Sequence, residues 1–300
     1  MRESKNVNKG EIIMKRKETH HSSSEQGLLL ENSAAPQPPS GIDLSHGRLD
    51  SVKTIRIAVT GDVFITRLEQ AIIDTPSFQR LRGVRQLGNV YHVYPTALHT
   101  RFDHSLGTLA MAERMLLAIE QNPGSNESER TVEPIQRTLT RLYALLHDIT
   151  HIPFGHTIED ELHLVTRHDE NPARIIHFLG LGSEIGELIL EEPSLGQAGL
   201  DRLLSVYLWD DDKETREKRK KQPEWVPLRK WLDLDSSPHD DLFIHDIVSN
   251  TVCADLLDYI QRDNYFCNLG ISLEYRFLNF LYLHSDPKNN SNKRRVFVRL

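Results

Sequence analysis

Titratable side chains crowd one short stretch of the sequence, LLHDITHIPFGHTIEDE at residues 145–161. His147 and Asp148 are adjacent near the end of an apolar helical stripe, and His151 lies one turn further along the same face. Burying a polar group without a partner costs about 1–3 kcal/mol, so these side chains are either solvated or bind something. Imidazole and carboxylate together are typical ligands of Mn, Fe, Co, Ni or Zn, and carboxylate also binds Mg. The stretch therefore predicts a divalent metal site.

Two other stretches offer the further ligands that such an ion needs. The stretch HTRFDHSLG places His104 in the first turn of a helix, close to Arg101. The stretch CADLLDYIQRD places Asp255, Tyr259 and Asp263 on one helical face, four residues apart. Each residue alone has an ordinary structural explanation, such as a capping histidine, a surface aspartate or a core tyrosine.

Hydrophobic periodicity predicts a mainly α-helical fold with a small N-terminal β element. The strand-like segments are TIRIAV, GDVFIT and, near the end of the chain, RRVFVRL. One helix is expected to begin with Thr75 as N-cap and Pro76 as first residue, and to run to Gly88. The further expected helices are one from about His104, one stopped by Pro153, several over 172–207 and one unbroken helix over 246–263.

The composition is typical of a soluble globular protein, with 38% hydrophobic and 26% charged residues in a chain of 300. A net charge of −7 gives no bulk attraction to nucleic acid or acidic membranes, although a local basic patch leaves nucleic-acid binding open. No apolar run approaches the roughly 18 residues of a membrane span, and the N-terminus has no signal-peptide core. Because the two cysteines suggest no disulfide framework, the expected location is the cytoplasm.

Composition also divides the chain. Residues 1–50 are rich in Ser, Pro, Glu and Lys and are expected to form a disordered arm. Residues 51–285 are expected to form the main domain, with a charged insertion at 209–240. Within the insertion, the segment 209–221 has an acidic block followed by a basic one, and we interpret it as solvated. A partner-binding patch is the alternative.

Five blocks of the sequence, in order, resemble one family. They are IIDTPSFQRLRGVRQLG, HTRFDHSLG, LLHDITHIPFGH, RHDE and ADLLDYIQRD. The pattern is similar to that of the HD-domain phosphohydrolases, and within them to the deoxynucleoside triphosphate triphosphohydrolase branch. The resemblance implies an HD-domain helical bundle and a metal bound by His104, His147, Asp148 and Asp255.

The resemblance also implies roles for residues around the metal. Those expected to bind the nucleotide substrate are Arg101 at the phosphates, Gln86 in the pocket, and Tyr259 and Asp263 at the sugar. Those expected to act in catalysis are His151, His156 and His168. Either Asp169 or Glu170 is expected to orient His168.

A regulatory role is implied for the first block. There, Asp74, Gln79 and Arg82 match contacts to an activating nucleotide at a subunit interface, so the chain is expected to form a homo-oligomer. The alternative is a capped helix start with a solvated face.

The sequence departs from the branch at three places. Leu256 stands where a phosphate-binding lysine is found, and Glu159 stands where the branch has aspartate. Residues 286–300 match only the beginning of a C-terminal lobe, which is expected to be truncated or absent.

The expected activity is hydrolysis of dNTPs to deoxynucleoside and inorganic triphosphate. The residues themselves indicate the metal and phosphate chemistry, whereas the substrate and the bond that breaks are implied by the resemblance. One alternative is an HD phosphohydrolase that acts on a nucleoside monophosphate, a cyclic nucleotide or an alarmone. Another is a nucleotide- or nucleic-acid-binding module whose catalysis has lapsed.

Overall fold

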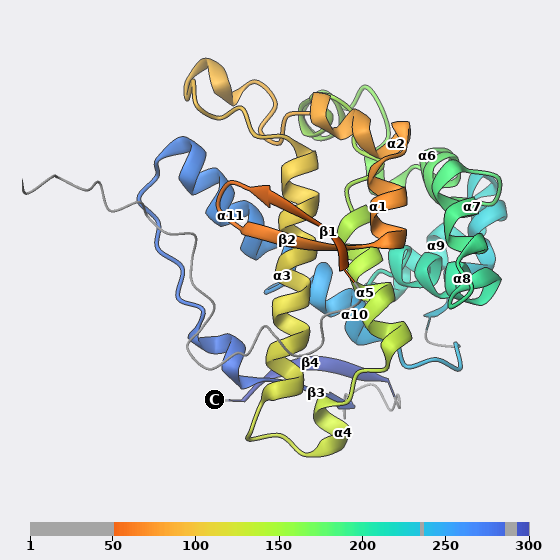
Figure 1. Cartoon of the computed structure of the whole chain (residues 1–300). Coiled ribbons are helices and arrows are strands. Elements are labelled where there is room, and N and C mark those ends of the chain that lie inside the picture. The colour runs from red at the N-terminus through yellow and green to blue at the C-terminus, as the bar shows by residue number, and fades with distance from the viewer. Residues whose placement is uncertain (1–50, 235–236, 286–292, 300) are drawn as a thin grey trace, which may run out of the picture. The chain divides into compact units, whose positions relative to one another are not determined.

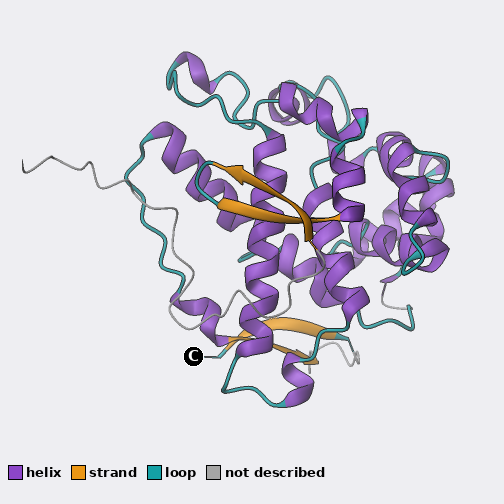
Figure 2. Ribbon diagram, in the orientation of Figure 1, coloured by secondary structure: helices purple, strands orange, loops and turns teal. Residues whose placement is uncertain are grey.

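A computed structural model describes residues 51–234, 237–285 and 293–299, which all belong to one unit of the chain. The arm expected at residues 1–50 lies outside them. Helices dominate this unit, and the described residues form only two small two-stranded sheets (Figure 2). The prediction of a mainly α-helical fold is confirmed. No helix in the described ranges combines the length and apolar composition that crossing a bilayer requires.

The N-terminal β element is an antiparallel hairpin of β1 (Ser51–Ile57) and β2 (Gly61–Thr66). Alternate β2 residues, Val63 and Ile65, are buried, as expected for a strand with one face on the core. The hairpin is fastened to the C-terminal part of the unit because Arg262 donates hydrogen bonds to the Ala58 carbonyl and the Thr60 hydroxyl.

Helix α3 (Arg101–Gln121) packs against both α5 (Pro134–Leu146) and α11 (Ala254–Cys267) (Figure 1). Thr100 and Asp103 form a capping box that fixes the start of α3 three residues before His104. A Cβ atom at Gly107 would collide with the Asp258 and Arg262 side chains, so the glycine permits the close approach of α3 and α11.

The apolar stripe of α5 is fully buried, including Leu139, Leu142 and Leu146. The helix ends at Leu146, and His147 follows as its C-cap. The histidines and carboxylates that begin with His147 therefore follow directly after the buried helix.

The prediction of one unbroken helix over 246–263 is wrong. The structure has α10 (Leu242–Val248) and α11, separated by five residues. In the gap the Asn250 side chain bonds to Asp246 and to the Thr251 amide, and Cys253 caps α11. Such side-chain bonds compete with helical backbone bonds, which explains the break.

The helix expected from Thr75 to Gly88 is shorter than predicted. Thr75 does cap α2 (Pro76–Gln79), but a 3₁₀ turn follows and ends at Gly83. Val84 is extended and its carbonyl accepts the Arg101 amide, so the backbone is used in a tertiary contact instead of a helix.

Shorter elements complete the unit, and helices do fill much of 172–207 as predicted. The remaining α-helices are α1 (Arg67–Ile73), α4 (Glu127–Arg130), α6 (Pro172–Leu179), α7 (Glu184–Glu191), α8 (Gly196–Tyr207) and α9 (Lys213–Lys221). The second sheet pairs β3 (Leu281–Ser285) with β4 (Arg294–Val298). The solvated interpretation of 209–221 is wrong for Trp209 and Arg216, which are buried with the guanidinium 3.9 Å above the indole ring.

Candidate active site

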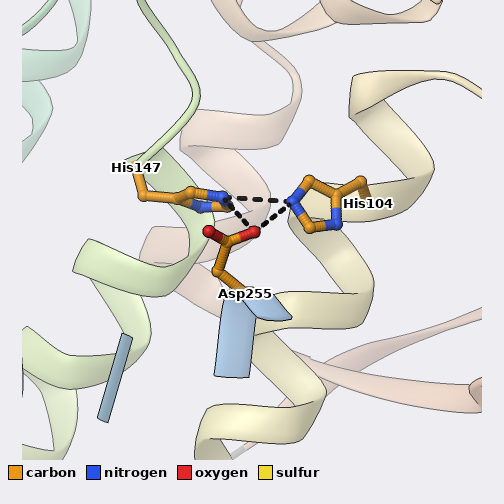
Figure 3. Close-up of side chains that lie close together, drawn as sticks. All are labelled: His104, His147 and Asp255. Atoms are coloured by element: carbon orange, nitrogen blue, oxygen red, sulfur yellow. Dashed lines mark hydrogen bonds and ion pairs between the residues drawn. The ribbon is translucent and has the colours of Figure 1, made fainter. Parts of the chain in front are cut away.

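Three side chains from distant helices converge on one point (Figure 3). His104 comes from α3, His147 from the end of α5 and Asp255 from the first turn of α11. The two imidazole Nε2 atoms are 3.2 Å apart, and Asp255 Oδ1 is 3.0 Å from that of His104 and 3.8 Å from that of His147. We call these three residues the ligand cluster, because one ion can contact all three of these atoms.

Both histidines of the ligand cluster are oriented through their other ring nitrogen. His104 Nδ1 lies 2.8 Å from Asp258 Oδ2, and His147 Nδ1 lies 2.8 Å from the Ala144 carbonyl oxygen. A proton on each Nδ1 directs each Nε2 toward the other at 3.2 Å, with Asp255 Oδ1 beside both. Two imidazole nitrogens and a carboxylate oxygen that converge in this way form a donor set that fits a divalent metal, which would take the place of any proton held between them.

Asp258 was not among the residues predicted for the site. It is held by a two-point ion pair with Arg262, at 2.7 and 2.9 Å. The sequence does contain a signal, because Asp258 and Arg262 are spaced i, i+4 in the same block as Asp255. Burial lowers the pKa of His104, but hydrogen bonds that the ring donates to Asp255 and Asp258 overcome this and raise it to about 10.

Asp148 contacts both histidines of the ligand cluster and also His151. Its carboxylate oxygens are 3.7 Å from His104 Nε2 and 3.6 Å from His147 Nε2, and one is 3.2 Å from His151 Nε2. Arg101 also donates a hydrogen bond to it. Although burial opposes ionisation, Arg101 and the two nearest histidines, His147 and His151, hold the Asp148 pKa well below its usual range.

The second group, Asp148, His151 and His168, is called the histidine group here. The His151 and His168 rings are stacked with their centroids 3.4 Å apart. Burial lowers the pKa of His151 to about 3, so its ring is neutral at pH 7. His156 lies beside this stack, with its ring centroid 5.1 Å from that of His151.

The expectation that Asp169 or Glu170 orients His168 is wrong. Glu159 does so, with its carboxylate 2.9 Å from His168 Nδ1. Asp169 is instead paired with Arg167 at 3.1 Å. Glu159 is buried and also accepts a 2.6 Å bond from Arg174, which fixes its second oxygen.

A cavity of about 490 Å³ opens over both groups. The predicted site residues that line it are Gln86, Arg101, His147, Asp148, His151, His156, His168, Asp255 and Tyr259. The Gln86 side-chain oxygen is buried and has no hydrogen-bond partner within the described ranges, as expected for a group that contacts a ligand. His104, the third residue of the ligand cluster, is fully buried and does not line the cavity itself.

Other predicted residues do not line this cavity. Asp263 bonds to His99 at 2.8 Å. Gln79 donates to the Ile73 carbonyl and accepts from Arg82, whose guanidinium lies 3.5 Å from the centroid of the Phe102 ring. Asp74 is exposed at the end of α1, where it accepts a 3.4 Å bond from Gln70.

One end of the cavity was not anticipated from the sequence at all. Its lining residues are Tyr143, Tyr207, Leu208, Trp209, Asp210, Arg219, His245 and Ser249. They come from α5, from the end of α8 and the segment after it, from α9 and from α10 with its C-terminal cap. No regular spacing in the sequence links these segments.

Comparisons with known proteins add a family signal to this geometry. The HD domain family matches residues 101–225. Deoxynucleoside triphosphate triphosphohydrolase SAMHD1 of Bos taurus is 30% identical over 241 residues, which make up 77% of this chain and 38% of that protein. This chain therefore spans about two fifths of the length of that relative.

Two further similarities come from proteins without an assigned activity. An uncharacterized protein of Methanocaldococcus jannaschii is 44% identical over 108 residues, 36% of this chain and 21% of that protein. The crystal structure of a hypothetical protein from Aquifex aeolicus superposes with a TM-score of 0.56 at 26% identity, covering 82% of this chain and 53% of that chain. The first of these proteins shares sequence with this chain, and the second shares both sequence and fold.

Proposed function

This chain belongs to the HD-domain proteins related to the deoxynucleoside triphosphate triphosphohydrolases, and we propose that it hydrolyses dNTPs in a metal-dependent reaction. The products are deoxynucleoside and inorganic triphosphate. The observation that carries the proposal is the ligand cluster at the floor of a cavity that also contains Arg101 and the stacked histidines.

The proposed roles follow from the donor set. His104, His147, Asp148 and Asp255 hold the ion, whose identity among Mn, Mg, Fe, Co, Ni and Zn is open. When bound, a divalent ion supplies Lewis-acid polarisation of a phosphoryl oxygen and lowers the pKa of water.

Arg101 is proposed to position the phosphates. Its guanidinium donates to Asp148 and lines the cavity, so it stands beside the reacting phosphoryl group. A guanidinium has a fork of donors that matches phosphate oxygens. Because Leu256 stands next to Asp255 and carries no charge, Arg101 has no cationic neighbour at that position. Gln86 and Tyr259 are proposed to contact the nucleoside part.

The stacked histidines are proposed to transfer the proton that the reaction needs. Water adds to the α-phosphorus, the bond to the 5′ oxygen breaks, and the leaving deoxynucleoside takes up a proton. Glu159 accepts at Nδ1 of His168, which leaves Nε2 of that ring free to carry the proton. Neutral His151 orients its stacked partner and contacts Asp148. His156 assists from the rim, where its ring pairs with Asp160.

One assay tests the proposal. The chain is incubated with each of the four dNTPs and Mn²⁺ or Mg²⁺, and the products are separated by anion-exchange chromatography. We expect equal amounts of deoxynucleoside and triphosphate, and none with His104→Ala. Release of orthophosphate or pyrophosphate would instead indicate a phosphohydrolase of another specificity. Nucleotide binding without turnover would indicate a binding module.

A further inference from the structure

The end of the cavity formed by α9 and α10 has no role in the chemistry described so far. We define this α9–α10 end by Asp210, Arg219, His245 and Ser249, which all line the cavity. It is continuous with the ligand cluster, because His147 and Asp255 line the same 490 Å³ space. A ligand that occupies the whole cavity therefore contacts both regions.

Of the three arginines that line the cavity, Arg219 has the longest ion pair. Arg101 donates to buried Asp148, and Arg167 pairs with both Asp169 and Asp160 at 3.1 and 3.2 Å. In the described ranges Arg219 has one ion pair, with Asp210 at 3.4 Å, a distance too long for a strong hydrogen bond, and its guanidinium lies 5.2 Å from the centroid of the Trp225 ring, a contact that uses none of its N–H donors. Its side chain is only 11% exposed, so most of its donors face the protein or the cavity.

Two neutral donors accompany Arg219. Ser249 Oγ accepts a 3.0 Å hydrogen bond from the Tyr143 hydroxyl, so its own proton is free to be donated. His245 is buried, and its Nδ1 has no partner in the part of the chain that the structure describes. Burial lowers the pKa of His245, which makes the ring neutral at pH 7. A neutral imidazole carries one N–H donor.

The wall that carries Arg219 is held firmly to the rest of the unit. Arg216, one turn earlier on α9, stacks on buried Trp209 at 3.9 Å. Trp209 in turn donates to Asp211, which pairs with Arg295 of β4 at 3.1 Å. Arg219 is therefore presented by a fixed helix.

From these contacts we infer that the α9–α10 end binds the terminal phosphates of the nucleotide, with Arg219 as the charged donor and His245 and Ser249 as neutral donors. The identity of the ligand as a nucleotide rests on the proposed function. Asp210, which is partly exposed, competes with the phosphate for Arg219 and is displaced toward solvent when phosphate binds.

Binding of inorganic triphosphate tests this subsite without any need for turnover. Titration calorimetry with Mg²⁺ compares the full chain with Arg219→Ala and with Lys218→Ala, a matched control because Lys218 is the exposed neighbour on the same helix. We expect Arg219→Ala to weaken triphosphate binding about 10- to 100-fold, as a charge-assisted hydrogen bond predicts, and Lys218→Ala to change it less than twofold. Binding of a deoxynucleoside monophosphate should be equal in all three proteins.

Two further variants guard against a folding defect. Ser249→Ala should weaken triphosphate binding about fivefold, as loss of a neutral hydrogen bond predicts. Asp210→Asn should tighten it. Equal affinities for Arg219→Ala and Lys218→Ala would overturn the inference, and so would weaker binding in both Arg219→Ala and Asp210→Asn, which would show that the pair only stabilises the wall. If triphosphate binds as expected but no dNTP is hydrolysed, the subsite stands and the proposed function fails.

Discussion

The ligand cluster and the histidine group lie side by side, and each contains a buried histidine within 4 Å of Asp148. His104 has carboxylates at both ring nitrogens, and its pKa is raised to about 10. His151 has only Asp148, which Arg101 already neutralises, and its pKa is lowered to about 3. At similar burial, the number of carboxylates that contact the ring thus decides whether an imidazole attracts positive charge. The cluster is suited to a cation and the group to proton transfer.

The largest effect is expected when a residue of the ligand cluster is removed. We expect His147→Ala to reduce metal binding strongly and to abolish hydrolysis, because only three of the four proposed ligands, His104, Asp148 and Asp255, remain. Metal content by mass spectrometry and turnover should fall together. Full metal content with full activity would exclude the cluster as the metal site.

Removal of a histidine from the second group should affect rate but not metal content. We expect His151→Ala to lower turnover about 10²- to 10⁴-fold, the usual range for an acid–base group or its partner. His156→Ala is the control, since its ring is largely exposed and we expect a smaller loss. An unchanged rate for His151→Ala at saturating metal would contradict the role proposed for the stack.

The carboxylate behind His104 should tune the cluster. We expect Asp258→Asn to weaken metal affinity about 10- to 100-fold, as found for partners that orient a metal-bound histidine. Asp246→Asn is a matched control, because Asp246 is equally buried and paired with Arg295 on another element. If both variants lose affinity equally, the effect comes from general destabilisation.

Metal affinity should also depend on pH. Without metal, the His104 ring is doubly protonated and positively charged up to about pH 10. An ion that binds at Nε2 must displace the proton on that nitrogen. Affinity should therefore rise about tenfold per pH unit between about pH 6 and 8, with one proton released. Calorimetry in two buffers of different ionisation enthalpy measures this proton. The absence of any buffer dependence would mean that His104 is neutral before metal binds.

The smallest expected effect concerns regulation. We propose that Asp74, Gln79 and Arg82 contact an activating nucleotide between subunits, so Arg82→Ala should reduce activation by GTP about fivefold and lower the oligomeric state. Sedimentation velocity and activity with and without GTP measure this. In the structure Gln79 and Arg82 bond to each other. A monomer under all conditions, indifferent to nucleotide, would leave them a structural role only.

Local sequence patterns correctly predicted which side chains of a helix face the core. The buried stripe of α5 and the position of His147 at its end follow from periodicity and from the polar residues after it. The family resemblance brought His104 and Asp255 into the same set, because nothing in local spacing relates α3 to α11.

What the sequence could not predict depends on tertiary contacts. Asp258 was overlooked because its partner His104 is 154 residues away. Glu159 was passed over for Asp169, which is nearer to His168 in sequence but pairs with Arg167. The charged segment after Trp209 gave no sign of lining the cavity, because cation–aromatic stacking buried a residue that composition alone marks as exposed.

Arg262 of α11 fastens the β1–β2 hairpin to that helix. The same guanidinium also pairs with Asp258, which orients His104. During synthesis on the ribosome the hairpin emerges early, whereas Arg262 and Asp255 emerge after most of the domain. The ligand cluster therefore cannot assemble until α11 docks on both the hairpin and α3, so a nascent chain released before α11 would have no complete ligand cluster.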